Sequence, residues 1–158
     1  MPIMKNKILF FSGKRGGINH FIPLINILKK SDKFNISLLF SDMHMSKIFG
    51  ETFNEFKNLL KDVHFVKSIN NKLDGSRANR AKQIPKAMDG IIKKLKIIKP
   101  NSVLVLGDRS ELFSIAIPCL ILNIPLIHLY GGDISEGSTD NATRYAISML
   151  SNIHLVSN

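Results

Sequence analysis

Acidic and basic side chains gather in two polar turns in the second half of the chain. The turns Gly107–Glu111 (GDRSE) and Gly131–Gly137 (GGDISEG) follow two short apolar runs, Val103–Leu106 and Leu126–Leu129. Because ligands of parallel α/β sheets bind beyond the carboxyl ends of the strands, we expect both turns to line one crevice. The residues expected there are Asp108, Arg109, Glu111, Asp133, Glu136, Asp140 and Arg144. Carboxylates and arginines in one cleft suit an anionic substrate and proton-transfer chemistry.

Asp108 has a structural alternative, because an aspartate directly before a helix commonly caps it. Ser110 can act as that cap, which would leave Asp108 facing the crevice. Asp133 and Asp140 carry the same ambiguity, since several polar residues before the last helix are reasonable caps. Three neighbouring carboxylates can separate their pKa values into an acid and a base, but the spacing does not say which is which.

The turn Gly13–Asn19 (GKRGGIN) is a candidate anion site. It follows the buried run Lys7–Ser12 and opens a helix, and backbone N–H groups at such a position can hold phosphate or carboxylate. Arg15 is favoured over Lys14 for contact with the anion. The turn is neither a Walker A loop nor a G-x-G-x-x-G fingerprint, and no acidic residue stands out as a ribose ligand. We therefore expect no NAD.

Metal and membrane functions find little support in the sequence. No histidine pair has zinc-ligand spacing, and Cys119, the one cysteine, lies in an apolar run as an inert core residue would. A lone cysteine also forms no internal disulfide, which fits a reduced, cytoplasmic setting. No apolar run has the length of a membrane span, and the start of the chain lacks a signal-peptide layout.

The net charge of +10 raises the question of nucleic-acid binding. The lysines of the segment 93–99 are spread around a helix beside apolar residues, as on a solvated face. Lys29, Lys30 and Lys33 cluster at a helix end, where cations complement the helix dipole. We expect no nucleic-acid partner.

Strand and helix patterns alternate along the whole chain, and residues 1–158 are expected to form one domain. The pattern predicts a doubly wound, parallel, six-stranded Rossmann-like sheet of the α/β class, with strand order 3-2-1-4-5-6. Asn70–Lys82 is predicted to be a polar loop, and Pro85 to lie in the first turn of a helix ending near Lys99. The remaining predicted strands are Lys7–Ser12, Asn35–Phe40, His64–Val66, Val103–Leu106, Leu126–Leu129 and Ile153–Val156, and the remaining helices are His20–Lys30, Thr52–Lys61, Glu111–Leu122 and Asn141–Leu150.

Five blocks together resemble the hydrolysing UDP-N-acetylglucosamine 2-epimerases. They are GKR near the start, SDMHMS after the second strand, LGDRSE after the fourth, IPLIHLYGGDISEG around the fifth, and DNATRYAISMLSNIHLVS at the end. The resemblance covers nearly the whole chain and implies the amino-terminal lobe of a GT-B fold, the carboxyl-terminal lobe being absent. It also implies conversion of UDP-GlcNAc to N-acetylmannosamine and UDP, through elimination of UDP and hydration of a glycal. This serves sialic acid or related surface-sugar synthesis and needs neither NAD nor an obligatory metal.

The resemblance assigns roles by position. Asp108, Asp133 and Asp140 match the carboxylates that move protons, and Arg15 matches an arginine near the nucleotide phosphates. His44, Arg109, Glu111 and Arg144 match positions that shape the substrate pocket. The sequence departs from the family at several positions: Lys14, Gly16 and Gly17 replace threonine, alanine and aspartate, Tyr130 and Tyr145 replace histidines, and Asp133 replaces glutamate.

Two classes of function follow from these observations. In the first, the chain is a 2-epimerase, or its separated first half, active only with a second lobe. In the second, it is a non-catalytic or partner-dependent subunit that binds a sugar nucleotide, as in split GT-B glycosyltransferases. A truncated chain without activity is the third possibility. The partners to expect are a nucleotide sugar, a separate carboxyl-terminal lobe, or further copies of the chain.

Overall fold

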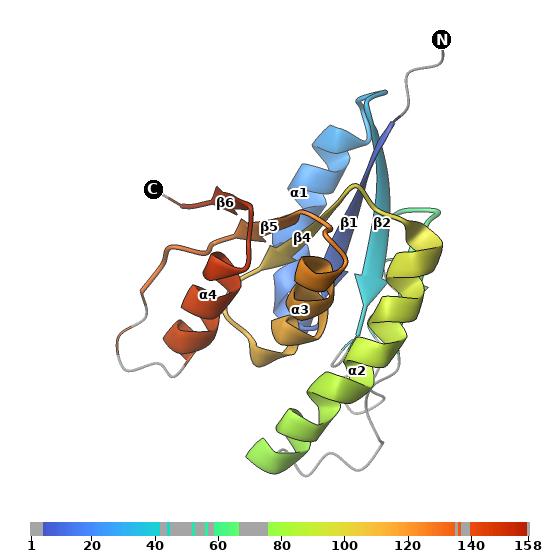
Figure 1. Cartoon of the computed structure of the whole chain (residues 1–158). Helices are drawn as coiled ribbons and strands as arrows, with labels where there is room; N and C mark the ends of the chain where they lie inside the picture. The colour runs from blue at the N-terminus through green and yellow to red at the C-terminus, as the bar shows by residue number, and fades with distance from the viewer. Residues whose placement is uncertain are drawn as a thin grey trace.

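The computed structural model describes residues 5–41, 44, 52, 56, 59–66, 76–134, 136 and 140–157, which form a parallel sheet with helices on both faces (Figure 1). The strands are β1 (Asn6–Ser12), β2 (Phe34–Phe40), β3 (Val63–Phe65), β4 (Ser102–Leu106), β5 (Leu126–Leu129) and β6 (Ile153–Leu155). The helices are η1 (Arg15–Gly17), α1 (Ile18–Leu28), α2 (Arg77–Ile98), η5 (Ser110–Leu112), α3 (Phe113–Ile121) and α4 (Asp140–Met149). The strand order β3-β2-β1-β4-β5-β6 confirms the predicted sheet and its α/β class.

The core has two apolar layers, one on each face of the sheet. Successive strand residues point to opposite faces, so Leu9 and Phe11 of β1 belong to one layer and Phe10 to the other. α1 closes the Phe10 side with Phe21 and Ile25. α2, α3 and α4 cover the opposite face. Because both faces are covered, the central strands are apolar almost throughout, which is the pattern that made them recognisable.

Most predicted boundaries agree with the structure to within two residues. This holds for α1, for α4, and for α3, which the short helix η5 precedes. The predicted helix Thr52–Lys61 and the start of the predicted loop, residues 70–75, lie largely outside the described residues.

The prediction for α2 was wrong over its first turns. The helix begins at Arg77, inside the segment predicted to be a loop, and Ser76 caps it by accepting a hydrogen bond from the Asn79 backbone N–H at 3.2 Å. The alanines, arginines, lysine and glutamine of residues 77–83 are polar on average but favour helix. Pro85 lies well inside the helix, with its side chain exposed. Polarity here marks a solvated helix face and not a loop.

Two smaller findings bear on the chemistry. Cys119 is fully buried and burial raises its pKa to about 12, so the thiol is an inert core group, as predicted. No helix within the described residues is both long and apolar enough to cross a bilayer.

Shortening Ile91 to alanine tests how α2 is held on the sheet. Ile91 is 0% exposed, so Ile91→Ala should lower the free energy of unfolding by roughly 2–5 kcal/mol through lost burial and a cavity. Ile97→Ala is the matched control on the same helix, because Ile97 is 69% exposed, and it should change stability by less than about 0.5 kcal/mol. Urea unfolding followed by circular dichroism measures both. Equal losses of unfolding free energy in the two variants would contradict the packing of Ile91 against the sheet.

Candidate functional site

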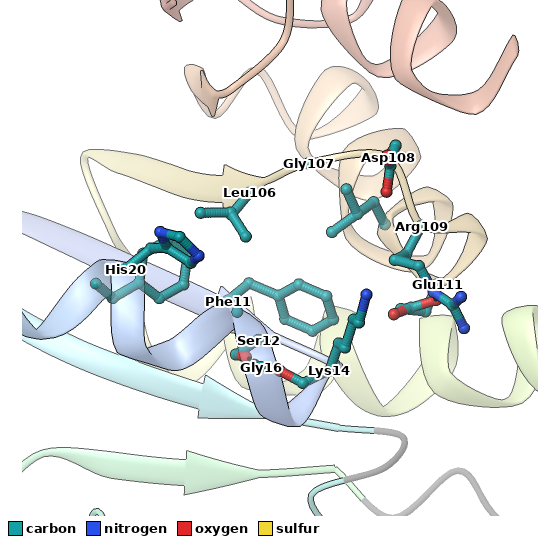
Figure 2. Close-up of a pocket in the computed structure, with 14 residues that line it drawn as sticks. Phe11, Ser12, Lys14, Gly16, His20, Leu106, Gly107, Asp108, Arg109 and Glu111 are labelled. Atoms are coloured by element: carbon teal, nitrogen blue, oxygen red, sulfur yellow. Dashed lines mark hydrogen bonds and ion pairs between the residues drawn. The ribbon is translucent and has the colours of Figure 1, made fainter. Parts of the chain in front are cut away.

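A pocket of about 220 Å³ opens at the carboxyl ends of β1 and β4 (Figure 2). The turn that follows β1, with the start of α1, forms one wall, and the segment from Leu106 to Leu112 forms the other. The polar side chains that line the pocket are Ser12, Lys14, His20, Asp108, Arg109 and Glu111. The pocket therefore lies where ligands of open α/β sheets bind, and it combines cations with carboxyl groups.

Glu111 packs tightly against the first turn. A Cβ atom placed on Gly13 would lie 2.7 Å from the Cγ atom of Glu111, so only glycine at position 13 leaves room for this side chain. The hydroxyl of Ser114 donates to the Glu111 backbone carbonyl at 2.5 Å and fixes the short helix η5. Burial raises the pKa of the Glu111 carboxyl, although Arg109 and Lys14 oppose the shift.

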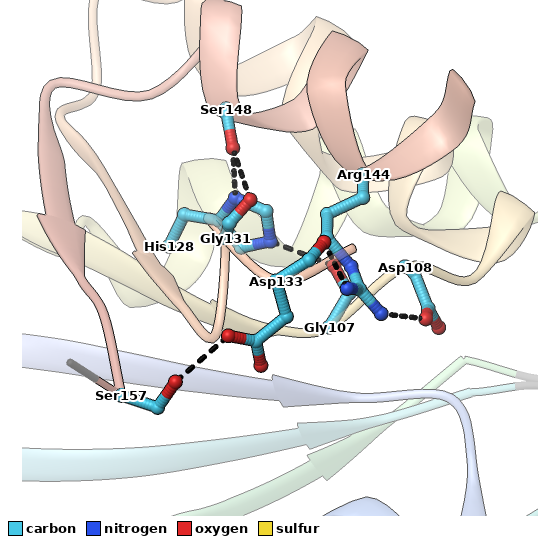
Figure 3. A network of polar contacts seen from close by, with 8 residues as sticks. All are labelled: Gly107, Asp108, His128, Gly131, Asp133, Arg144, Ser148 and Ser157. Carbon is cyan, nitrogen blue, oxygen red and sulfur yellow. Dashed lines mark hydrogen bonds and ion pairs between the residues drawn. The ribbon is translucent and has the colours of Figure 1, made fainter. Parts of the chain in front are cut away.

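Arg144 of α4 joins the turns after β4 and β5 (Figure 3). Its guanidinium donates to a carboxylate oxygen of Asp108 and to the backbone carbonyl of Asp133. The Arg144 side chain is only 8% exposed, so these bonds are shielded from water. Arg109 occupies the N-cap position of η5 without a side-chain capping bond, and Ser110 is the first residue inside that helix, so neither Asp108 nor Ser110 lies at the cap position. Asp108 is thus an ion-pair partner at the rim of the pocket.

The other two candidate acids are placed differently. The Asp133 carboxylate accepts a hydrogen bond from the Ser157 hydroxyl at 2.7 Å, and in Figure 3 it points away from Asp108. Asp140 is the first residue of α4 and lies one helical turn before Arg144, on the same face of that helix. The structure therefore brings all three acids to one edge of the sheet. Arg144 contacts the backbone carbonyl of Asp133 and not its carboxylate.

His128 of β5 stabilises the same edge of the sheet through contacts with the turn after β4 and with α4. Its Nε2 atom lies 2.7 Å from the Gly107 carbonyl, which can only accept, so this nitrogen carries the proton. Its Nδ1 atom lies 3.0 Å from the Ser148 hydroxyl, which also lies 3.1 Å from the Gly131 carbonyl. Burial lowers the pKa of His128, which favours the neutral ring. The sequence showed this histidine at a strand end but not the network it organises.

His44 was predicted to shape the substrate pocket, but its side chain lies beneath the pocket and is 0% exposed. Nε2 contacts the Ser12 hydroxyl and Nδ1 contacts the Thr52 hydroxyl, each at 2.9 Å. Ser12 in turn donates to the Lys14 carbonyl at 3.2 Å. A neutral imidazole satisfies this chain of bonds, and burial, helped by Arg15, lowers the pKa of His44 to about 4. His44 therefore holds the first turn in place from within the fold.

The two cations of the first turn point to different hollows. Lys14 lines the main pocket, and Figure 2 shows its amino group reaching into it. Arg15, the predicted anion contact, is exposed and lines a neighbouring open hollow with Asn19 and Thr52. The sequence favoured Arg15 over Lys14 as the anion contact because it does not show in which direction each side chain points. Lys14 and His20 line the main pocket, and neither was among the predicted site residues.

The charges suit an anion together with proton transfer. Lys14 and Arg109 are cations at the pocket, Asp108 is an oriented carboxylate, and Glu111 is a buried carboxyl group. Within the described part of the chain, no three His, Cys, Asp or Glu side chains gather as a metal site.

The neutral state of His44 predicts how stability depends on pH. Its pKa is about 4 in the folded chain against 6.5 for an ordinary histidine, so the unfolded chain binds the proton more readily. The contribution of His44 is therefore complete above pH 6.5 and should decline by about 3 kcal/mol as the pH falls towards 4. Urea unfolding between pH 7.5 and 4 should show a steeper loss for the wild type than for His44→Gln.

The matched control for this prediction is His154→Gln, because His154 is exposed on β6. It should leave the pH dependence close to that of the wild type. An imidazole NMR titration offers an independent check, with the His44 midpoint far below the ordinary value of 6.5. Parallel stability curves for the wild type and His44→Gln would show that the buried ring has an ordinary affinity for protons.

The chain resembles known proteins in sequence and in structure. A family model described as UDP-N-acetylglucosamine 2-epimerase matches residues 26–158. The UDP-N,N'-diacetylbacillosamine 2-epimerase (hydrolyzing) of Legionella pneumophila is 31% identical over 97% of this chain and 40% of its own length. The GDP/UDP-N,N'-diacetylbacillosamine 2-epimerase (hydrolyzing) of Campylobacter jejuni is 30% identical over 97% of this chain and 39% of its own length.

The fold agrees with these matches. The crystal structure of UDP-GlcNAc 2-epimerase from Neisseria meningitidis bound to UDP-GlcNAc superimposes with a TM-score of 0.75 at 20% identity, over 97% of this chain and 40% of that one. The chain thus spans about two fifths of the length of the relatives it matches. On the strength of the family match, which extends over most of its residues, the chain belongs to the UDP-N-acetylglucosamine 2-epimerase family.

Proposed function

We propose that this chain provides the proton-transfer side of a cytoplasmic hydrolysing 2-epimerase acting on a UDP-linked 2-acetamido sugar. The reaction converts UDP-GlcNAc, or a close analogue, to UDP and the free 2-epimer for sialic acid or related surface-sugar synthesis. The observation that carries the proposal is the Asp108 carboxylate, which lines the pocket and is oriented by the nearly buried Arg144. The family match supports the same reaction class.

The chemistry requires two proton removals, from C2 of the sugar and from the attacking water, and one proton delivery, to C2. A carboxylate removes the proton at C2 of the sugar, and the C1–O bond breaks with its electron pair moving to the phosphate. UDP departs and a glycal remains. Water then adds its hydroxyl to C1 while a carboxylate accepts its remaining proton, and a carboxylic acid returns a proton to C2 from the opposite face. We assign the first step to Asp108, whose Oδ2 atom is the one bonded to Arg144, and the later transfers to Asp133 and Asp140. Arg15, Lys14 and Arg109 are the cations for the diphosphate.

A second wall is part of the proposal. The pocket measures about 220 Å³, below the roughly 300–1,000 Å³ usual for small-molecule sites and too small for a sugar nucleotide. Large apolar side chains are also exposed on β6 and beside the turn after β5, as expected of a surface that another lobe covers. These are Ile134, Ile153, Leu155 and Val156. We propose that a carboxyl-terminal lobe, from the same polypeptide or a partner, completes the site.

A binding subunit without catalysis is the second candidate. The direction of the Asp133 carboxylate, which is bonded to Ser157 and turned away from Asp108, favours it. In that case UDP and UDP-GlcNAc should bind to the completed two-lobe protein with no release of UDP. The Legionella pneumophila relative is named for UDP-N,N'-diacetylbacillosamine, which is therefore the second substrate to assay.

The 158-residue chain alone should release little or no UDP from either sugar nucleotide, because half of the site is open. Addition of the carboxyl-terminal portion of the Campylobacter jejuni relative should restore turnover, measured as UDP release by a coupled assay. That portion by itself is the control. Robust turnover by the 158-residue chain would show that one wall suffices and would end the two-lobe proposal.

Asp108→Asn tests the base directly. In the reconstituted enzyme it should lower kcat by about 10²–10⁴, because a positioned proton-transfer group contributes that much. The fold should stay intact, since asparagine can still accept a bond from Arg144, but the melting temperature should fall because the nearly buried guanidinium loses its counter-charge. Asp89→Asn is the matched control, an exposed aspartate on α2 paired only at the surface with Lys93. If Asp108→Asn melts early but its folded fraction has full activity, Asp108 is a structural partner of Arg144 and not the base.

A further inference from the structure

Glu111 stands between two hollows of different character. On one side lies the main pocket with Lys14 and Arg109. On the other lies a cavity of about 30 Å³ against α2, whose lining includes Ser41 and Arg80. Glu111 lines both hollows, and its side chain is only 12% exposed. Its carboxyl group therefore lies between a ligand pocket and a second, smaller hollow.

The small cavity contains polar groups that the described residues leave unsatisfied. The Ser41 hydroxyl and the Arg109 Nε atom are both buried without a hydrogen-bond partner. Such groups in folded proteins are usually satisfied by ordered water, and one water needs only about 10–15 Å³. The cavity has room for water at this position. Water behind Glu111 would give its carboxyl a route for proton exchange on the side opposite a ligand.

Several charged groups face Glu111 from the elements packed around it. Lys14 approaches from the turn after β1, and the Arg109 Nε atom lies 3.6 Å from Oε2, beyond hydrogen-bond distance. Arg80 on α2 lines the small cavity. Asp108 and His20 line the main pocket from its other sides. The cations favour the carboxylate, but burial is the largest effect, and the pKa of Glu111 is raised.

We propose that Glu111 is protonated when a phosphate-bearing ligand occupies the pocket, so that the ligand binds together with one proton wherever Glu111 is ionised in the free protein. An ionised Glu111 would place a negative charge beside the phosphates and would compete with them for Lys14 and Arg109. A neutral Glu111 leaves both cations to the ligand. The inference rests on the proposed function, which supplies the diphosphate of a UDP sugar as the ligand class.

This coupling has a definite sign. A bound anion stabilises the protonated carboxyl, so the pKa of Glu111 rises on binding, and protonation strengthens binding by the same factor. Above the pKa of Glu111 in the free protein, binding must take up a proton from solution. The affinity for UDP should then fall by up to about tenfold per pH unit, until the pKa of the bound state is reached.

The first test observes the carboxyl group itself. Side-chain carboxyl carbons of the glutamates are followed by NMR as the pH is raised, with the Glu111 signal assigned by its absence in Glu111→Gln. The Glu111 midpoint should lie above the usual value for a glutamate side chain, and should rise further with millimolar UDP. An ordinary midpoint, or an elevated midpoint that UDP does not raise, overturns the inference. This measurement needs no catalytic activity.

The second test compares binding. Calorimetric titration with UDP between pH 6 and 9 should show the ratio of affinities, Glu111→Gln over wild type, increasing with pH, because glutamine mimics the neutral acid and stays neutral. The ionisation of UDP itself cancels in this ratio. Asp89→Asn is the matched control, because Asp89 is exposed on α2 away from the pocket, and it should follow the wild type. A ratio that stays constant with pH, whatever its size, shows that Glu111 acts only through packing and overturns the coupling.

The two proposals fail in distinguishable ways. If the reconstituted enzyme releases UDP but the Glu111 midpoint is ordinary, the coupling is wrong and the proposed function stands. If UDP and inorganic pyrophosphate raise the Glu111 midpoint but no UDP sugar is turned over, the coupling stands and the proposed reaction is wrong.

Discussion

The ion pair between Arg144 and Asp108 connects the segments on which the site depends. One guanidinium from α4 binds the carboxylate that follows β4 and the backbone carbonyl of Asp133 that follows β5. Because Arg144 is nearly buried, loss of either bond would leave a desolvated charge without compensation. The shape of the rim is therefore determined by a helix packed against the sheet, and not by the strand ends alone.

The sequence predicted the sheet well because both of its faces are covered. Parallel strands such as β1 and β4 are apolar over their buried stretches, and this pattern is visible without coordinates. The first turns of α2 were missed because residues 77–83 present mostly polar side chains. A helix that buries only a stripe can look like a loop when polarity is averaged, since helix propensity and polarity are separate properties.

The location of the candidate site was predictable from the sequence, but the direction and burial of its side chains were not. Strand ends placed Asp108, Glu111 and Asp133 at one edge, and the structure brings them there. The direction of each side chain depends on packing that spacing does not encode. His44 follows its strand as a ligand contact would, yet it is wholly buried. Lys14 and Arg15 are adjacent in sequence, but they line different hollows.

Neutral imidazoles brace both strand ends without adding charge. His44 supports the turn after β1 and His128 supports the turn after β4, each through two directed contacts. Burial lowers both pKa values, and a protonated ring would be repelled by Arg15 at His44 and by Arg144 at His128. A lysine at either position would introduce a buried cation, which is costly without a partner. Because the braces are neutral, the positive field at the pocket comes from side chains that a ligand can reach, which is the arrangement that anion binding requires.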